Sequence, residues 1–300
     1  MPLLRSPVIT RFAPSPSGPL HVGHLLAACE ARRLADAHGG RCLLRLEDID
    51  TARTRDPRWV PLLHEDLAWV GLRFDGGAPL VQSRRFPIYS AALEQLRRRG
   101  LIYPCFCTRA EIRAQWAESA RAPHGPAAHL YPGACRHLPA DLVAERLAAG
   151  VPCAWRLNMR RVQDLIGCPL WRDLRRGLQR CVPTLCDDAV LARKDTPASY
   201  HLAVVVDDAA QGVTLVTRGE DLFESTHIHR ALQAVLGLPT PLYCHHPLLR
   251  DAAGARLAKR DGARSISSLR AAGLRPADVL DSLRLALSRG GVWEPPRGAV

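Results

Sequence analysis

The sequence lacks the features that would place it in a membrane, outside the cell or among disordered chains. No apolar run approaches the roughly 18 residues that a membrane span needs, and the strongest run, residues 202–206, has the length of a strand. Residues 1–10 lack the apolar core of a signal peptide, so a cytoplasmic protein is expected. With 300 residues, 47% hydrophobic and 23% charged, the chain can bury a core of one large or two modest domains, which excludes wholesale disorder.

Lysine is scarce: of 41 basic residues, only Lys194 and Lys259 are lysines. The net charge of +12 favours a polyanionic partner, although a soluble surface explains such a charge as well. The bias toward arginine lowers the weight of any single arginine and raises that of the two lysines. The ten cysteines are expected to be reduced thiols, a minority of which bind metal.

The apolar spacing predicts the start of a parallel α/β sheet. Residues 7–12 are typical of a strand, the spacing turns helical from about Val22 until Gly39-Gly40, and residues 41–46 form a second predicted strand. Residues 101–195 hold seven of the ten cysteines without this rhythm, so an insertion is predicted there. The other predicted elements are helices over 57–71, 87–100 and 225–236, strands over 200–206, 213–217 and 242–249, two short helices within 265–289, and a frayed tail over 290–300.

The first strand-to-helix turn carries two histidines in the run His21-Val22-Gly23-His24, and the chain has neither a Walker A loop nor a G-x-G-x-x-G run. A helix N-terminus offers backbone N–H groups and a partial positive charge, which favour phosphate. Gly23 leaves room for a ligand, and the two imidazoles share a helix face and can donate to phosphate. On this evidence alone, two solvent-facing histidines are an equally good interpretation.

A second cationic segment, Arg256-Leu257-Ala258-Lys259-Arg260, lies in a polar, glycine-containing loop near the C-terminus. It holds one of the two lysines. Such a loop can close over a triphosphate and neutralise the charge that develops when pyrophosphate is displaced. A basic surface loop is the alternative.

Together, the two segments resemble the signature motifs of class I aminoacyl-tRNA synthetases. The first matches their HIGH motif, and the second resembles their KMSKS loop with Arg256 for the first lysine and Ala258 for the serine; Lys259, the lysine expected to meet ATP, is retained. A closer resemblance, to glutamyl-tRNA synthetases, is carried by RFAPSPSG at 11–18, RLEDID at 45–50, AVVVDD at 203–208 and TRGEDL at 217–222.

The resemblance implies an ATP-dependent ligase with a Rossmann-like, parallel-sheet α/β catalytic domain. The implied domains are the first half of the catalytic domain over 1–100, an inserted zinc-binding, acceptor-type subdomain over 101–195, the second half over 196–250, and the signature loop with a short helical stem-contact module over 251–300. The α-carboxylate of glutamate would attack the α-phosphorus of ATP, and positioning and charge stabilisation would supply the catalysis. The resemblance assigns catalysis to His21, His24 and Lys259, and ATP binding, with Mg²⁺, to these three and Gly23.

The glutamate site that the resemblance implies agrees with the chemistry of its residues. Arginine binds carboxylates bidentately, and Arg11 and Arg218 stand at the ends of predicted strands, where α/β ligands bind. Glu47 can hold the ammonium group, and Tyr200, at the start of a predicted strand, can bound the pocket. The full implied set is Arg11, Phe12, Ala13, Pro14, Ser15, Glu47, Tyr200 and Arg218.

Three cysteines of the insertion, Cys105, Cys107 and Cys135, are of the ligand type that suits a structural zinc ion. On chemistry alone the fourth ligand stays open among the nearby residues His124, His129 and His137. The family pattern, Cys-x-Cys followed by Tyr-x₃-Cys, instead implies Tyr131, and thus one zinc per chain on Cys105, Cys107, Tyr131 and Cys135. The remaining cysteines are expected to be small buried residues.

Only 40 residues follow Arg260, whereas an ordinary glutamyl-tRNA synthetase continues into a helical anticodon-binding region. This combination resembles the glutamyl-queuosine tRNA(Asp) synthetases, truncated paralogues that attach glutamate to queuosine. The resemblance implies activation of glutamate without tRNA and transfer to the anticodon stem-loop of tRNA(Asp), by a monomer without membrane contact. The alternatives are charging of the 3′ end of tRNA(Glu), transfer to a non-RNA acceptor, and a non-catalytic RNA-binding role.

Overall fold

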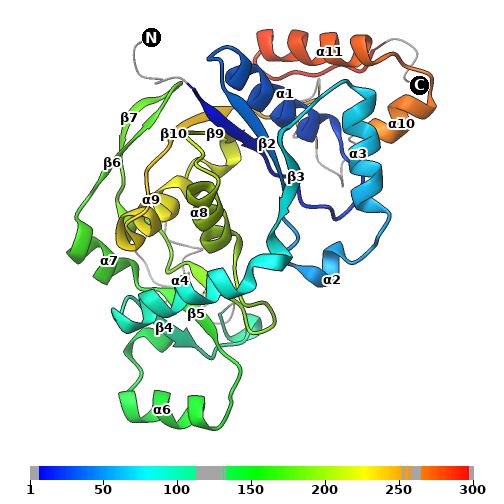
Figure 1. Ribbon diagram of the computed structural model, residues 1–300. Coiled ribbons are helices and arrows are strands. Elements are labelled where there is room, and N and C mark those ends of the chain that lie inside the picture. The colour runs from blue at the N-terminus through cyan, green and yellow to red at the C-terminus, as the bar shows by residue number, and fades with distance from the viewer. Residues whose placement is uncertain are drawn as a thin grey trace.

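The computed structural model describes residues 7–112, 131, 133–251, 254–255, 257 and 265–296. Two sheets form the main body of the structure (Figure 1). The first is parallel, in the order β1-β2-β3, with β1 at Ile9–Phe12, β2 at Arg41–Leu46 and β3 at Asp75–Val81. The second runs β7-β6-β10-β9, with β6 at Leu170–Asp173, β7 at Gly177–Arg180, β9 at Leu215–Gly219 and β10 at Leu242–His246, and only β7 is antiparallel.

The two sheets meet where β1 lies beside the start of β9. The backbone N–H of Thr214 donates to the carbonyl of Ile9 at 2.9 Å, and the N–H of Ile9 donates to Oγ1 of Thr214 at 2.9 Å. The strands therefore follow one another as β3-β2-β1 and then β9-β10-β6-β7. In a sheet wound outward from the middle, ligands bind at the carboxyl ends of the strands on either side of this junction. That rule directs attention to the ends of β1 and β9.

Helix α1 (Val22–Asp36) joins β1 to β2 and confirms the predicted strand–helix–strand unit. Its buried face includes Leu25, Leu26 and Ala31, and Oγ1 of Thr10 in β1 donates to the carbonyl of Ala31 at 2.9 Å. The helix ends at Asp36, shortly before Gly39, whose φ of +60° suits a residue without a side chain. The unit thus presents the first turn of α1 directly after β1.

The other helices surround the sheets and join the two halves (Figure 1). Residues 59–69, 86–98 and 225–236 are helical as predicted. The bounds are α2 Thr51–Thr54, α3 Trp59–Trp69, α4 Phe86–Arg98, α6 Ala140–Ala148, α7 Met159–Ile166, α8 Tyr200–Ala210, α9 Ser225–Leu236, α10 Ile266–Ala271 and α11 Pro276–Ser288, with short 3₁₀ turns η1 Gln82–Arg85, η2 Ala134–His137, η3 Pro183–Leu185 and η4 Glu220–Leu222.

The prediction of a strand over residues 200–206 is wrong, because this segment begins the helix α8. Four successive residues from Leu202 to Val205 are buried, since the helix packs in the core against several neighbours. An apolar run that is buried on all sides carries no periodicity, so the sequence cannot tell such a helix from a buried strand. Tyr200 consequently opens a helix, following the N-cap Ser199.

The segment predicted as an insertion contributes to two sheets. Its own antiparallel sheet has the order β4-β5-β8, with β4 at Ile102–Cys105, β5 at Ala154–Leu157 and β8 at Val190–Ala192. Strands β6 and β7, which lie between β5 and β8 in the chain, join the large sheet through β10. Helix α6 stands out from the body at the far end of this small sheet (Figure 1).

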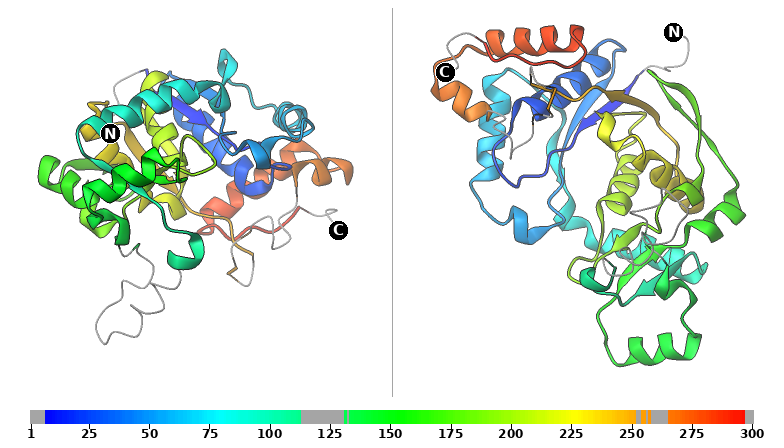
Figure 2. Two further views of the ribbon diagram at one scale, coloured as in Figure 1. Left: turned by 90° about the horizontal axis from the view of Figure 1, so that it is seen from below. Right: turned by 180° about the vertical axis from the view of Figure 1, so that it is seen from behind.

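Helices α10 and α11 confirm the two predicted C-terminal helices and pack beside α1 and α3 (Figure 2). The predicted frayed tail over 290–300 is wrong for its first residues, and positions 297–300 lie outside the described residues. Trp293 is only 5% exposed; its backbone N–H donates to the carbonyl of Arg250 at 2.8 Å, and its indole N–H donates to Ser282 at 3.0 Å. The gain from burying a large aromatic side chain anchors this segment. None of the described helices combines the length and apolar character needed to cross a membrane.

Candidate active site

The residues predicted to bind substrates converge at the carboxyl ends of the central strands. Arg11 lies near the end of β1, Glu47 directly follows β2, and Arg218 lies near the end of β9. His21 is the N-cap of α1, the helix that follows β1. The sheet junction therefore gathers residues from segments some two hundred positions apart into one crevice.

His21 and His24 form a reciprocal cap at the start of α1. Nδ1 of His21 accepts the backbone N–H of Gly23 at 3.1 Å, Nδ1 of His24 accepts the N–H of His21 at 3.2 Å, and the two rings stack with centroids 3.7 Å apart. A neutral imidazole that accepts at Nδ1 carries its proton on Nε2. Both rings are therefore set as Nε2–H donors, which is the tautomer that a phosphate oxygen requires.

Gly23 is needed for this cap as well as for ligand access. A Cβ at this position would lie 3.0 Å from the Cε1 and Nδ1 atoms of the His21 ring. A side chain here would push that ring away from the N–H group that it accepts. Gly23, predicted from the sequence to leave room for a ligand, thus also leaves room for the ring of His21.

A cavity of 200 Å³ lies in front of this turn. His21 and His24 line it together with Gly219 and Asp221, which follow Arg218, and with His246 at the end of β10. Leu257 of the second signature segment lines the same cavity. The position beside a helix N-terminus suits the phosphates of a nucleotide.

The described residues that flank the second signature segment lie against the histidine turn. The N–H of Leu257 donates to the carbonyl of Leu249 at 3.0 Å, and the N–H of Ile266 donates to the carbonyl of Leu20 at 2.8 Å. Ser265 also forms an isolated antiparallel bridge with His21. Arg256, Ala258, Lys259 and Arg260 lie outside the described residues, so their predicted roles stay predictions.

Arg11 belongs to a buried ion network, and its predicted contact with glutamate stays a prediction. Its Nε donates to Oδ1 of Asp208 at 2.9 Å, the same oxygen accepts Nη1 of Arg45 at 2.7 Å, and Arg45 also donates to Glu47 at 3.1 Å. Burial alone would raise the pKa of Asp208, but the two guanidinium groups hold it below its ordinary value. The charge of Arg11 is therefore shared with a carboxylate of the protein.

Arg218 has a different environment, because its partners are neutral. It is 6% exposed. Its Nη1 group lies 3.3 Å from the hydroxyl of Tyr200 and 2.9 Å from Nδ1 of His229, and its Nη2 group donates to Thr226 at 2.7 Å. No carboxylate of the described part of the chain forms an ion pair with it. Such a buried cation creates a site for an anionic ligand.

The histidines around Arg218 are held in the neutral state. Arg218 Nε donates to Nε2 of His245 at 3.1 Å, and Nδ1 of His245 bonds Oδ2 of Asp173 at 2.7 Å. Burial lowers the pKa of His245 despite this carboxylate. Burial, followed by the charge of Arg218, lowers the pKa of His229 well below its ordinary value and that of His201 to about 4. These rings add no positive charge that would compete with Arg218 for an anion.

A cavity of 170 Å³ is bordered by Tyr200, whose hydroxyl lies 3.3 Å from Nη1 of Arg218, although Arg218 is not itself among the residues that line it. Ser15, Glu47 and Tyr200 line it, and burial raises the pKa of Glu47 against the opposing charges of Arg45 and Arg11. Of the other predicted glutamate-binding residues, Phe12 packs its side chain in the core against Phe74, and Pro14 accepts the N–H of Glu47 at 3.0 Å through its carbonyl. Ala13 lies between them on the loop that borders the cavity.

The predicted metal ligands come together at the end of β4. The sulfur atoms of Cys105, Cys107 and Cys135 lie within 4.8 Å of one another, with Cys107 and Cys135 3.4 Å apart. The hydroxyl of Tyr131 lies 3.3 Å from the sulfur of Cys105 and accepts the backbone N–H of Cys135 at 3.0 Å. Gly133, with φ of +83°, makes the turn that returns the chain to Cys135.

These donors fit a structural zinc ion. Three thiol sulfurs and one phenol oxygen lie close together, and thiolates are the ligands that zinc prefers in tetrahedral structural sites. His137 is exposed and is not part of this cluster, and His124 and His129 lie outside the described residues. Of the other seven cysteines, Cys42, Cys181 and Cys244 are buried as expected, and Cys29, Cys153, Cys168 and Cys186 are partly exposed.

Several residues of the site were not singled out from the sequence. Asp208 lies in the AVVVDD motif, but its pairing with Arg11 spans 197 positions and leaves no local signal. His229 and His245 stand in the histidine-rich runs His227-Ile228-His229 and His245-His246. These two runs were the signal in the sequence that could have pointed to the two residues, since histidine is common at catalytic and metal-binding sites.

Comparison with known proteins identifies relatives along nearly the whole chain. Residues 7–290 match the family model for the catalytic domain of class I tRNA synthetases (E and Q). A glutamyl-Q tRNA(Asp) synthetase from Rhodobacter capsulatus is 51% identical over 91% of this chain and 98% of its own length. One from Nocardia farcinica is 45% identical over 96% of this chain and 85% of its own length.

A solved structure agrees with this relationship. The crystal structure of a glutamate tRNA ligase from Elizabethkingia meningosepticum, in complex with its amino acid, superimposes with a TM-score of 0.73 and 31% identity over 86% of this chain. The aligned part is 53% of that ligase, so the present chain spans about half its length.

Proposed function

The chain belongs to the class I tRNA synthetases of the glutamate and glutamine type and is an ATP-dependent ligase, and from this premise we propose that it activates glutamate without tRNA and transfers it to queuosine. The acceptor is the anticodon loop of tRNA(Asp). The name that the relatives carry, glutamyl-Q tRNA(Asp) synthetase, supports that acceptor. The compartment that we propose is the cytoplasm, where tRNA is found, and the working unit is a monomer.

The observation that carries glutamate as the amino acid is the buried, unneutralised charge of Arg218. A dicarboxylic amino acid supplies the missing anion through its side chain, with Tyr200 and Thr226 fixing the orientation of the guanidinium. The forked guanidinium can bind such a carboxylate with two hydrogen bonds. Glutamine offers no charge there, so it would leave the buried cation unpaired, which is the costly case.

The activation step then uses the geometry of the crevice. Glu47 holds the ammonium group of glutamate, and the α-carboxylate points toward the 200 Å³ cavity in which the phosphates of ATP lie against His21 and His24. The Nε2–H groups of the two histidines donate to phosphate oxygens, and Lys259 neutralises the charge that moves onto pyrophosphate. Mg²⁺ bound to ATP would further shield the charge of its phosphates. No side chain acts as a nucleophile.

The zinc ion that we propose on Cys105, Cys107, Tyr131 and Cys135 has a structural role. It joins the end of β4 to the turn at η2 in a small subdomain that has little apolar core of its own. A metal supplies the stability that so small a core lacks.

The experiment that tests the proposal is incubation with labelled glutamate, ATP and total tRNA, followed by nuclease mapping of the label. The expected result is label in the anticodon loop of queuosine-containing tRNA(Asp), together with glutamate-dependent pyrophosphate exchange in the absence of tRNA. Label on the 3′ adenosine of tRNA(Glu) and none in the anticodon loop would overturn the acceptor. Absence of pyrophosphate exchange would overturn the activation step as well.

A further inference from the structure

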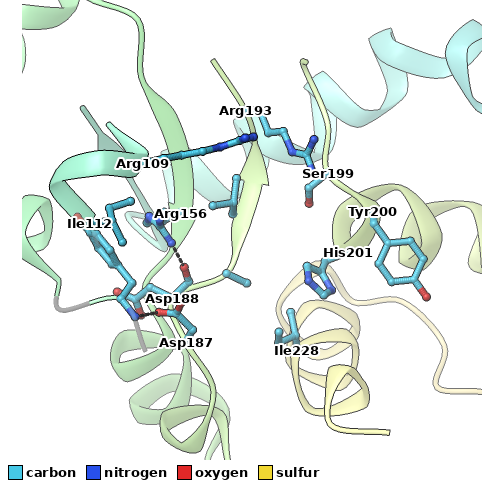
Figure 3. A pocket seen from close by; sticks show the side chains of 13 residues that line it. Arg109, Ile112, Arg156, Asp187, Asp188, Arg193, Ser199, Tyr200, His201 and Ile228 are labelled. Carbon is cyan, nitrogen blue, oxygen red and sulfur yellow. Dashed lines mark hydrogen bonds between the residues drawn. The ribbon is translucent and has the colours of Figure 1, made fainter. Parts of the chain in front are cut away.

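A third cavity, of 540 Å³, lies between the insertion and the start of helix α8 (Figure 3). One wall comes from the small sheet and the residues before β8, and the other comes from Ser199–His201 and from Ile228 of α9. Arg193 and Tyr200 line both this cavity and the 170 Å³ cavity of the candidate glutamate site. Because it shares these residues with the candidate glutamate site, the 540 Å³ cavity is placed to receive the third substrate of the ligase.

The walls and the edge of this cavity have the character of a nucleoside site. Ile112, Val190 and Ile228 supply apolar surface, against which a planar base can pack. Arg109 and Arg193 lie at one edge (Figure 3), and their guanidinium groups can bind a flanking phosphate. The volume lies within the roughly 300–1,000 Å³ that is usual for sites of small molecules, and an unstacked loop base is the usual target of specific RNA recognition.

Asp187 supplies a carboxylate group to the lining of this cavity. Its Oδ1 atom accepts the backbone N–H of Tyr131 at 2.8 Å, and it forms no ion pair with any residue that the structure describes. Its neighbour Asp188 is instead occupied, because it accepts the hydroxyl of Tyr103 at 2.6 Å and pairs with Arg136. The charge of Asp187 is therefore the one that the cavity offers to a ligand.

The nearest cation, Arg156, is oriented toward other groups. Its guanidinium carbon lies 3.8 Å from the centre of the Tyr131 ring, its Nη1 donates to the backbone carbonyl of Asp188 at 2.8 Å, and it interacts with Cys105. Arg156 also interacts electrostatically with Asp187, but these hydrogen bonds and contacts hold its guanidinium on other groups, and the two side chains form no ion pair.

We infer that this cavity binds the acceptor nucleoside, and that it selects a base bearing a substituent that is both cationic and hydroxylated. The apolar walls hold the base, Arg109 binds a phosphate beside it, and Asp187 pairs with the cation. Queuosine meets this description, because a secondary amine, protonated at neutral pH, joins its base to a cyclopentenediol. The inference rests on the proposed function and adds the location of the acceptor and the residue that selects it.

The adjoining cavities allow the transfer step to be written in full. A hydroxyl oxygen of the substituent attacks the glutamyl carbonyl carbon beside Tyr200. The new ester C–O bond forms as the bond from that carbon to the phosphate oxygen of AMP breaks, and the hydroxyl proton is released as AMP leaves. No oxidant or further reactant is required.

The variant Asp187→Asn tests the selecting charge, because asparagine keeps an oxygen that can accept the N–H of Tyr131 and replaces the other carboxylate oxygen with an uncharged NH₂ group. Transfer of labelled glutamate to queuosine-containing tRNA(Asp) is expected to fall at least ten-fold, while pyrophosphate exchange without tRNA and zinc content stay within two-fold of the wild type. Free queuosine nucleoside, titrated against the protein, is expected to bind at least ten-fold more weakly. Asp195→Asn, an exposed carboxylate in the same segment, is the matched control and should transfer normally.

A second variant, Val190→Phe, fills the cavity without changing its charge and should reduce transfer and nucleoside binding in the same way. The inference would be overturned if Asp187→Asn transferred glutamate and bound the nucleoside as well as the wild type does. It would also be overturned if both variants lost zinc and pyrophosphate exchange together, because these residues would then have a structural role. A wild-type protein that labels no anticodon loop would instead overturn the proposed function, and the nucleoside titration would then decide the cavity on its own.

Discussion

Nη1 of Arg218 lies 2.9 Å from Nδ1 of His229, and both side chains are buried. A histidine that accepts from an arginine must be neutral and must carry its proton on Nε2, which lies 3.1 Å from Nδ1 of His201. The chain of hydrogen bonds therefore orients Arg218 through neutral groups alone. An arginine held in this way keeps its full charge for a ligand, unlike Arg11, whose charge is shared with Asp208.

The first prediction concerns Arg218 itself. Arg218→Lys keeps the positive charge but loses the forked guanidinium that contacts Tyr200, Thr226 and His229. We therefore expect kcat/KM for glutamate in pyrophosphate exchange to fall about 10–100-fold. This loss corresponds to the roughly 1.5–3 kcal/mol of a hydrogen bond to a charged group. Most of the effect should appear in KM. Arg160→Lys, on the exposed face of α7, is the control, and equal effects of the two would show that arginine is not required at position 218.

The second prediction concerns the two lysines. Removing one well-placed donor to developing charge typically lowers the rate about 10²–10³-fold, so Lys259→Ala should nearly abolish glutamate-dependent exchange. Lys194 donates to the carbonyl of Phe106 at 2.8 Å, away from the nucleotide cavity, and Lys194→Ala should change exchange little. A similar loss in both variants would mean that general positive charge matters rather than the signature loop.

The parts of the fold that could be predicted from the sequence are those specified by local patterns. The unit from β1 through α1 to β2 has a strand, a capping histidine turn and an amphipathic helix in immediate succession, so each boundary has its own signal. Helix α8 has no such signal, because the four successive residues from Leu202 to Val205 are all buried. The burial of Trp293 could not be predicted from the sequence either, because it depends on hydrogen bonds to Arg250 and Ser282.

The candidate site was predictable only as a set of residues. The motifs identified Arg11 and Arg218 as two equivalent cations. Their difference arises from contacts across the sheet junction: Asp208 reaches Arg11 from α8, and His245 reaches Arg218 from β10. A sequence pattern reports which residue types are present, whereas the neutralisation of one arginine and not the other is a property of the folded packing.

The third prediction concerns the metal. Purified protein should contain one zinc ion per chain, and Cys105→Ser should lose it, because a hydroxyl is a poor substitute for a thiolate ligand. Tyr131→Phe tests the fourth ligand and should weaken retention of zinc against a chelator. His137→Ala is its control, since that side chain is exposed. Loss of zinc in His137→Ala with normal retention in Tyr131→Phe would move the fourth ligand to the histidine.

The fourth prediction concerns a buried carboxylate beneath α10. Asp66 has a fully buried side chain whose charged partner, Nη2 of Arg270, lies 3.9 Å away, and burial raises its pKa from 3.8 to about 6 despite that arginine. The folded protein therefore binds this proton more tightly than the unfolded chain. The resulting stabilisation is complete below about pH 4 and is lost as the pH rises through about 6.

Asp66→Asn should accordingly raise the free energy of unfolding at pH 7.5 by about 2 kcal/mol and flatten its decline between roughly pH 4 and pH 7. Denaturant midpoints measured across that range check the result. Glu65→Gln is the matched control, because Glu65 binds the same Arg270 at 3.2 Å with a side chain that is 62% exposed. An unchanged pH profile in Asp66→Asn would contradict the raised pKa.

The last prediction separates the two half-reactions by their dependence on salt. In the proposed function, activation takes place in the two small cavities, where the largely buried charges of Arg218 and Glu47 are poorly screened. Transfer requires a polyanion to dock on a protein of net charge +12, and each phosphate contact releases counterions, so affinity for RNA falls steeply with ionic strength. Raising the salt from about 50 to 200 mM should therefore lower transfer at limiting tRNA by at least ten-fold and change pyrophosphate exchange by less than two-fold.

Arg109→Ala removes one cation at the edge of the 540 Å³ cavity. This variant should reduce the slope of log transfer against log salt concentration by about one unit and leave exchange unaffected. Equal salt dependence of the two half-reactions would mean that RNA docking does not limit transfer.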